Sequence, residues 1–237
     1  MYDLYTVMKS VNIELSDVQI NQLNIFYEML VDTNKVMNLT AITDYDEVAV
    51  KHFADSAAIH NVYDMSKVKS IIDVGTGAGF PGIVLKIIYP DTEILLLDSL
   101  QKRINFLDSV AERLALRGIK TVHGRAEDIA HDKLHREKYD LCVSRAVAAL
   151  SSLSEYCIPF VKIGGAFVSY KAAACEKEVC DAGNAIKLLG GKIKEVAECT
   201  LEPEKLVRKF VTMQSSCSMR LRTLPCSRSR CSLPVSA

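Results

Sequence analysis

Acidic side chains and glycines gather where three short apolar runs end, and groups of these types could together hold a nucleoside. The run SIIDV leads into a loop with four glycines within residues 75–82. The run EILLLD ends on Asp98, and the run TVHG is followed by Arg-Ala-Glu-Asp at 125–128. If these runs are neighbouring parallel strands, the three groups meet at one edge of the sheet, where ligands of such folds bind.

The glycine loop needs a reason, because glycine costs conformational entropy when a chain folds. The stretch GAGFPG matches the GxGxxG dinucleotide fingerprint, but it begins two residues later than a fingerprint at the strand end should. From the strand end the pattern is Asp73-x-Gly75-x-Gly77-x-Gly79. An acid before the first glycine would repel a pyrophosphate but can anchor the cationic end of a sulfonium amino acid. We therefore expect these four residues to cradle such a ligand, with an ordinary strand-to-helix turn as the alternative.

The two later acids fit the remaining parts of a nucleoside. Asp98 follows the glycine loop at about the 20-residue separation at which an acid meets the ribose hydroxyls of a bound nucleotide. NAD and S-adenosylmethionine both present those hydroxyls. Glu127, after the third run, can accept a hydrogen bond from an adenine amino group. A helix-capping role is the alternative for each acid.

The elements that must position these groups follow from an alternation of short apolar runs with helical patterns. This alternation is typical of a parallel sheet covered by helices on both faces. We expect Pro81 in the first turn of the helix after the glycine loop, where its missing N–H is no loss. The predicted strands lie at 70–74, 93–98, 121–124, 139–144 and 165–170, with two more at 192–199 and 205–213.

The first 65 residues look helical. Apolar residues recur at three- and four-residue spacing between residues 20 and 31, and a second helical stretch covers about 45–62. Between them we expect a loop at Asn34-Lys35 and again at residues 38–40. The chain thus divides into an N-terminal helical extension (1–65), an α/β domain (66–213) and an atypical, disordered tail (214–237) rich in Ser, Cys and Arg.

Composition excludes several classes of protein. The net charge is zero over 237 residues, which argues against strong indiscriminate binding to nucleic acid. Residues 205–237 nevertheless carry seven basic and no acidic side chains, so a local phosphate contact is open. Eight scattered cysteines without a CxxC pair indicate reduced thiols and no zinc site. There is no apolar stretch long enough for a membrane span and no signal peptide, which favours a cytoplasmic protein.

In combination, several segments resemble one family, the bacterial 16S rRNA guanine-N7 methyltransferases of the glucose-inhibited division protein B type. The resemblance covers about residues 25–213. It rests on NKVMNLTAI (34–42), KHFADS (51–56), IIDVGTGAGFPG (71–82), LLDSLQKRINFL (96–107), GRAED (124–128), SRAVA (144–148) and VKIGGAFVSYK (161–171). The glycine loop alone would indicate only a class I methyltransferase.

The resemblance implies a fold, a donor and a substrate. The fold would be the α/β class I S-adenosylmethionine-dependent methyltransferase fold, Rossmann-like, with a mostly parallel seven-stranded sheet and an N-terminal helical extension. S-adenosylmethionine would be the methyl donor, with no metal. The substrate would be one guanine in the 530-type loop of 16S rRNA, met as free rRNA or in the small ribosomal subunit, and a monomer is the default state. The family positions that contact the donor correspond to Gly75, Phe80, Ala126, Glu127 and Arg145.

The chemistry of guanine N7 needs no general base, because its lone pair is free at neutral pH. Catalysis should come mostly from holding N7, the methyl carbon and sulfur in line. Arg145, directly after the fourth run, is the candidate catalytic residue: it could pair with the donor or contact guanine O6, with a structural ion pair as the alternative. Lys171 could meet an RNA phosphate or simply be solvated, and His52 is expected to pack within a helix, with a positioned histidine near the active face as the alternative.

Three other functions stay open on the residues. The chain could be a class I methyltransferase for another substrate, an NAD-dependent oxidoreductase, or a non-enzymatic RNA-binding assembly factor that keeps the fold. The chain is short for the second domain that an oxidoreductase needs. The Ser/Cys/Arg tail also departs from the family, whose members commonly end in a Lys/Pro-rich segment, and this bears on the grip on RNA but not on donor binding.

Overall fold

The structure is a computed structural model that describes residues 2–145 and 148–216. Residues 217–237, most of the predicted tail, lie outside the described part. Within it, the last strand runs to Ser215, two residues past the predicted end of the domain. Ser216 then donates from its backbone N–H and its hydroxyl to the carbonyl oxygen of Gly190. Ser216 is therefore still part of the α/β domain.

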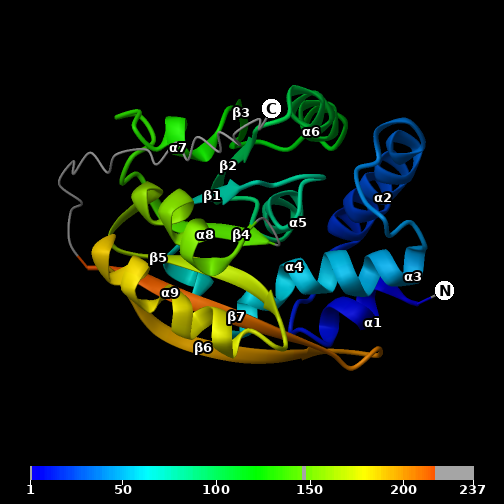
Figure 1. Cartoon of the computed structure of the whole chain (residues 1–237). Helices are drawn as coiled ribbons and strands as arrows, with labels where there is room; N and C mark the ends of the chain where they lie inside the picture. Colours follow the sequence, from blue (N-terminus) through cyan, green and yellow to red (C-terminus); the bar gives the residue numbers. More distant parts are fainter. Residues whose placement is uncertain (1, 146–147, 217–237) are drawn as a thin grey trace, which may run out of the picture.

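One seven-stranded sheet forms the centre of the molecule, in the order β3-β2-β1-β4-β5-β7-β6 (Figure 1). The first five strands pair in parallel, and β7 pairs antiparallel to both β5 and β6. This confirms the mostly parallel sheet that the sequence predicts. The strands are β1 Ser70–Val74, β2 Glu93–Asp98, β3 Ile119–His123, β4 Tyr139–Arg145, β5 Val161–Ala172, β6 Gly191–Leu201 and β7 Leu206–Ser215.

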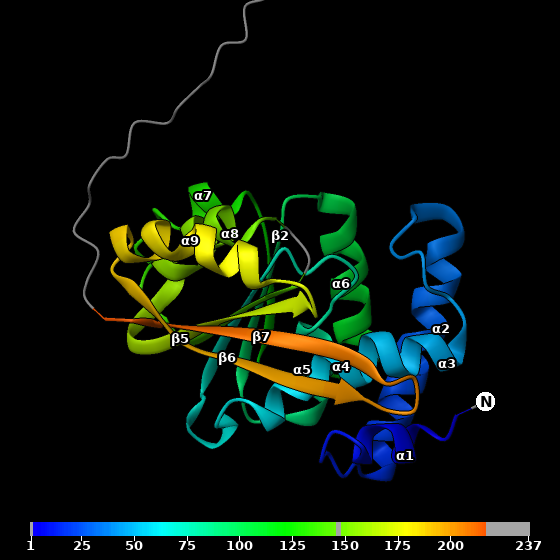
Figure 2. The ribbon, with the colours of Figure 1, turned by 60° about the horizontal axis from the view of Figure 1, so that its bottom comes forward.

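Helices cover both faces of this sheet, because alternate strand residues point to opposite faces. In β1, Ile71 packs into the core shared with α5, α6 and the N-terminal helices, whereas Ile72 packs into the core shared with α8 and α9. Figure 2 shows α7, α8 and α9 on one side of the sheet, and α6 and the N-terminal helices on the other. The helices are α5 Gly82–Ile88, α6 Gln101–Arg113, α7 Ala126–Ile129, α8 Leu150–Cys157 and α9 Glu176–Leu188.

The N-terminal residues form helices that pack on the α5 and α6 face. Ser16 and Gln19 make a capping box that starts α2, and Asn38, in the left-handed conformation, ends it. The predicted loop at Asn34-Lys35 is wrong, because α2 continues to Met37. Asn34 instead holds the following loop from within the helix, since its side chain bonds both backbone groups of Thr40. The first helices are α1 Leu4–Lys9, α2 Asp17–Met37 and α3 Tyr45–Val48.

A π-helical segment, Ala49–Ala54, follows α3 without a break and leads into α4, Asp55–Ala57. Such segments change which side chains a helix presents, and they are frequent at functional sites. Here the segment and the residue after it place His52 and Asp55 among the buried residues. The extension therefore contributes polar side chains to the interior next to the sheet.

Candidate active site

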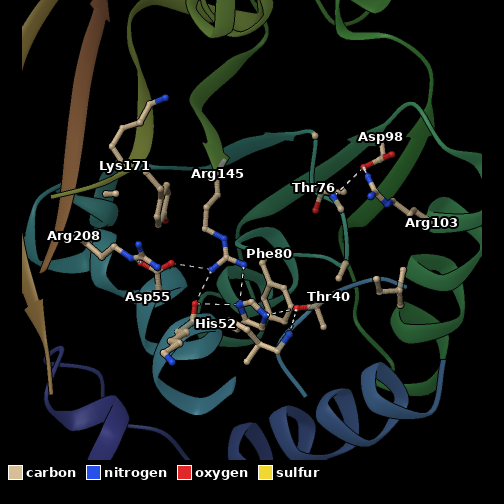
Figure 3. Close-up of a pocket in the computed structure, with 18 of the residues that line it drawn as sticks. Thr40, His52, Asp55, Thr76, Phe80, Asp98, Arg103, Arg145, Lys171 and Arg208 are labelled. Carbon is tan, nitrogen blue, oxygen red and sulfur yellow. Dashed lines mark hydrogen bonds and ion pairs between the residues drawn. The ribbon is translucent and has the colours of Figure 1, made fainter. Parts of the chain in front are cut away.

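A cavity of about 640 Å³ opens at the carboxyl ends of β1, β2, β4 and β5 (Figure 3). The strand order runs from β1 through β2 to β3 on one side and from β4 to β5 on the other, so the switch point of the sheet lies between β1 and β4. Open α/β sheets bind ligands at this point. Residues from the glycine loop, from the helical extension and from β7 line it together. The cavity is thus built from segments that lie far apart in the sequence.

The glycine loop lies at the floor of this cavity. Gly75 and Gly77 have φ of 70° and 62°, values that side-chain-bearing residues rarely adopt. A Cβ on Gly77 would find only the carbonyl oxygen of Gly75, at 4.0 Å, so this face of the loop is open to a ligand. Gly79 serves packing instead, because its Cβ would lie 2.7 Å from Cγ1 of Ile83. Pro81 is the residue before α5, not a residue of its first turn as predicted.

Asp98 ends β2 beside the loop and is 3% exposed. One carboxylate oxygen accepts from the N–H of Gly77 at 2.9 Å and lies 3.3 Å from Nη1 of Arg103. The other accepts from the N–H of Leu100 at 2.9 Å. The carboxylate therefore holds the loop in place and still lines the cavity at the position expected for a ribose.

A second cavity, of about 220 Å³, continues from the first on the side of β3. The two share Gly75, Asp98 and Ser99. Ala126 and Glu127, in the first turn of α7, line the second. The carboxylate of Glu127 pairs with Arg125 at 3.0 Å and is partly exposed. The residues predicted to meet the ribose and the adenine thus line two adjoining cavities.

Asp73 lies beneath the loop and does not line either cavity. It is fully buried, and one oxygen accepts from the N–H of Gly82, the first residue of α5, at 2.8 Å. Burial raises the pKa of Asp73 to about 6, against the opposing effects of Thr76 and of the Gly82 N–H. Its other oxygen and the hydroxyl of Thr76 are buried without a hydrogen-bond partner among the described residues. Buried polar atoms without partners indicate a place where a polar ligand group or water completes the structure.

Phe80, His52 and Arg145 form a stack at the other end of the cavity (Figure 3). The rings of Phe80 and His52 lie 4.5 Å apart and nearly parallel, and the Arg145 guanidinium lies 5.1 Å from the Phe80 ring. Nδ1 of His52 lies 3.3 Å from Nη2 of Arg145 and 3.1 Å from the carbonyl oxygen of Lys51, and Nε2 bonds the hydroxyl of Thr40 at 3.0 Å. Burial and the charge of Arg145 lower the pKa of His52 to about 3, so this imidazole is neutral.

Asp55 connects two arginines below this stack. Its two carboxylate oxygens each receive one guanidinium, from Arg145 and from Arg208, both at 2.9 Å. Asp55 is 1% exposed, and both arginines line the cavity. Arg145 thus takes part in an ion pair, which was the alternative to a direct ligand contact. Figure 3 shows the two arginines reaching Asp55 from different elements, β4 and β7.

Sequence reasoning missed Thr40, Asp55 and Arg208 as parts of the site. The first two lie within the segments that carry the family resemblance, whereas only the basic character of the C-terminal end pointed toward Arg208. Lys171 lines the cavity but is neither solvated nor free, because Nζ lies 2.6 Å from the carboxylate of Glu178. His52 is buried as expected, yet it also lines the cavity.

Metal-binding groups, disulfides and membrane-spanning helices were each sought in the described part of the chain. Within 2–145 and 148–216, no group of three or more His, Cys, Asp or Glu side chains could hold a metal ion. The five cysteines in this part of the chain are free thiols. No helix described here is long and apolar enough to cross a membrane.

Comparison with known proteins identifies close relatives. The model of the family described as rRNA small subunit methyltransferase G matches residues 19–207. The ribosomal RNA small subunit methyltransferase G of Clostridium novyi (strain NT) is 46% identical over 214 residues, which cover 90% of this chain and 88% of that protein. The protein of the same name from Listeria monocytogenes serotype 4b (strain F2365) is 49% identical over 205 residues, 86% of either chain.

Solved structures share the fold at low sequence identity. A SAM-dependent methyltransferase from Aquifex aeolicus matches with a TM-score of 0.55 and 15% identity, over 74% of this chain and 96% of that one. The ribosomal protein L11 methylase from Lactobacillus delbrueckii subsp. bulgaricus matches with a TM-score of 0.52 and 13% identity, over 70% and 79%. These matches support the methyltransferase fold that the sequence predicts.

Proposed function

Because the chain belongs to the rRNA small subunit methyltransferase G family, we propose that it methylates N7 of one guanine in the 530-type loop of 16S rRNA. The family gives the class of reaction, S-adenosylmethionine-dependent methylation of small-subunit rRNA. The atom, the loop and the residues that act are our proposal. One observation carries it: two cavities that share Gly75, Asp98 and Ser99 are lined by Glu127 at one end and by Arg208 at the other, which offers separate places for a nucleoside donor and a base.

The residues of the donor half suit S-adenosylmethionine. Asp98 would accept from the ribose hydroxyls, and Ala126 and Glu127 would lie against adenine. Gly75 and Gly77 would allow the backbone to approach the methionine part. The negative charge of the buried Asp73 would attract the cationic amino group from below the loop, without direct contact. Gly79 supports this half through its packing against α5.

The acceptor half suits a base that attacks without losing a proton. S-adenosylmethionine supplies a methyl group on a cationic sulfur, and the N7 lone pair of guanine displaces the sulfur in line. The protein therefore orients two reactants and accommodates positive charge moving onto the base. The neutral His52 and the face of Phe80 meet this need without adding positive charge. Arg145 holds this end of the cavity together, which makes it the candidate catalytic residue for orientation.

We further propose that the protein works as a cytoplasmic monomer in which the helical extension (1–65) is part of the site. The extension and the sheet domain both line the cavity, so neither should act alone. The proposed reaction uses no metal ion, because neither a deprotonation nor a leaving oxygen has to be stabilised. A non-enzymatic assembly factor would need no donor half, and a methyltransferase for another substrate would need no affinity for small-subunit rRNA.

The test is methyl transfer from radiolabelled S-adenosylmethionine to small ribosomal subunits that lack their natural methylation. We would compare the full chain, a form ending at Ser216, which keeps all of β7, and Asp98→Ala. Label recovered as 7-methylguanosine from the 530-type loop, and absent with Asp98→Ala, is expected. Donor binding without transfer to the subunit or to free 16S rRNA would contradict the proposal. Equal activity of the form ending at Ser216 would show that the tail is dispensable.

A further inference from the structure

Arg208 differs from Arg145 in how many of its donors are used. In Arg145, Nη1 donates to Asp55 and to the carbonyl oxygen of Lys51, and Nη2 contacts His52. In Arg208, only Nε donates a hydrogen bond within the described part of the chain, and it does so to Asp55. Its two terminal nitrogens have no hydrogen-bond partner among the described residues, although the side chain lines the cavity and is 24% exposed. Arg208 thus has donors to offer a ligand, whereas Arg145 mainly ties elements together.

The bond to Asp55 limits where those donors can point. A guanidinium is planar and rigid, so holding Nε against a buried carboxylate restricts the directions in which both terminal nitrogens can point. Asp55 is held in turn by Arg145 and by its place at the start of α4. A carboxylate that is 1% exposed and accepts from two arginines has little freedom to turn. Asp55 therefore sets the orientation of Arg208.

The other cations around the cavity are less suited to meet the base. Arg103 lies beside Asp98, in the donor half. Lys171 pairs with Glu178, and Lys51 pairs with Glu47 and Glu204. Among these cations of the described chain, only Arg208 lies against Asp55 and also has terminal donors without a partner in that part of the chain.

We propose that Asp55 is a positioning residue that directs the terminal nitrogens of Arg208 to O6 of the acceptor guanine, and that this contact selects guanine over adenine. The inference rests on the proposed function. Guanine presents O6, an acceptor, next to N7, whereas adenine presents an amino donor there. N7 must keep its lone pair for the methyl group, so the arginine serves the base through O6 alone. The carboxylate of Asp55 offsets guanidinium charge where the ring becomes cationic.

The test pairs one side chain with one atom of the base. Small subunits are rebuilt around 16S rRNA in which the acceptor guanine is replaced by 2-aminopurine, which keeps N7 but lacks O6. Both substrates are given to the wild-type protein and to Arg208→Gln, with Arg117→Gln, at an exposed position outside the cavity, as the matched control. A hydrogen bond to a charged group is worth a factor of about 10 to 100. Loss of O6 should therefore lower kcat/KM about 10- to 100-fold in the wild type and in Arg117→Gln.

In Arg208→Gln the same atomic change should cost about threefold or less, because the donor is already gone. Asp55→Asn should lower kcat/KM on the guanine substrate in the same direction, add little to Arg208→Gln when combined, and leave the affinity for S-adenosylmethionine within about twofold. Equal rates of the wild type on both substrates, or an undiminished O6 effect in Arg208→Gln, would overturn the inference. Failure of the wild type on the guanine substrate would instead overturn the proposed function. If Asp55→Asn does not fold, the Arg208→Gln comparison still decides.

Discussion

Replacing Gly77 by alanine tests whether this glycine is needed for ligand binding or only for the backbone conformation of the loop. Gly77 has a φ of 62°, and its N–H bonds Asp98 at 2.9 Å. Its missing Cβ faces open space in the cavity. Alanine in the left-handed region costs about 1–2 kcal/mol. Part of this is offset because alanine restricts the unfolded chain, by about 0.4–1 kcal/mol.

The net loss of stability is therefore about 1 kcal/mol, which lowers Tm by about 2–4 °C for a domain of this size. Donor binding should suffer more. If the strained loop relaxes and releases Asp98, the donor has to restore it, and a cost of 1–2 kcal/mol weakens binding by a factor of about 5–30. The added methyl group also occupies space that the donor must enter. We expect the affinity for S-adenosylmethionine to fall by at least this factor.

Gly118→Ala is the matched control, because Gly118 also has a positive φ, 68°, and lies in the turn before β3, at the opposite end of the sheet. Its Cβ would lie 3.2 Å from Nζ of Lys86, which donates to the carbonyl oxygens of Pro90 and Thr92, and 4.0 Å from the side chain of Glu93. Thermal unfolding and isothermal titration with S-adenosylmethionine are measured on both variants. Gly118→Ala should lose at least as much stability as Gly77→Ala, yet only Gly77→Ala should lose affinity. Unchanged affinity in Gly77→Ala would refute the claim that this face of the loop meets the donor.

Gly82→Ala should destabilise the fold by about 1–3 kcal/mol in urea titrations, because its Cβ would overlap Cδ2 of Leu96; unchanged stability would contradict the close packing of α5 on β2. The His52 pKa of about 3 lies below its ordinary value of 6.5, so the unfolded chain binds the extra proton between these values. Unfolding free energy should therefore fall by about 1.4 kcal/mol per unit as pH drops through this window, relative to His52→Gln, which should lack that slope. Because the pKa of Asp73 is about 6, donor affinity measured by titration should weaken between pH 7 and pH 5 as its carboxylate is protonated, and Asp73→Asn should remove this dependence; an identical pH profile in the variant would exclude a role of the Asp73 charge.

The sheet, and the grouping of Asp98 with the glycines at its edge, could be predicted because their signals are local. Each strand is a short apolar run, and Asp98 and the glycines stand directly at strand ends, so one sequence suffices to place them at the same edge. Asp73 lies at the predicted edge of the sheet, but it is buried under the loop, where it accepts a hydrogen bond from Gly82, and it does not face the cavity. No pattern of residue types distinguishes a carboxylate that faces a cavity from one that supports its floor.

The acceptor half could not be predicted because its contacts join distant residues. Asp55 and Arg145 are 90 positions apart, and Asp55 and Arg208 are 153 positions apart. Asp55 stands on a helical stretch where an acid is ordinarily a solvated residue, and Arg208 stands on an edge-side strand among other basic residues. The prediction of a loop at Asn34 failed for a related reason, since its amide bonds Thr40 from inside the helix.

Because the antiparallel strand β7 comes last among the described strands, the two halves of the proposed site are synthesised at different times. Residues 73–127, which carry the proposed donor half, precede β7 in the chain, and Asp98 reaches Gly77 across 21 positions. The acceptor half closes only when β7 inserts beside β5 and brings Arg208 to Asp55, which also requires closing a much longer loop. In the proposed function, the residues that would meet the methyl donor are therefore synthesised before the arginine that would meet the base, and the site is complete only once β7 has paired with β5.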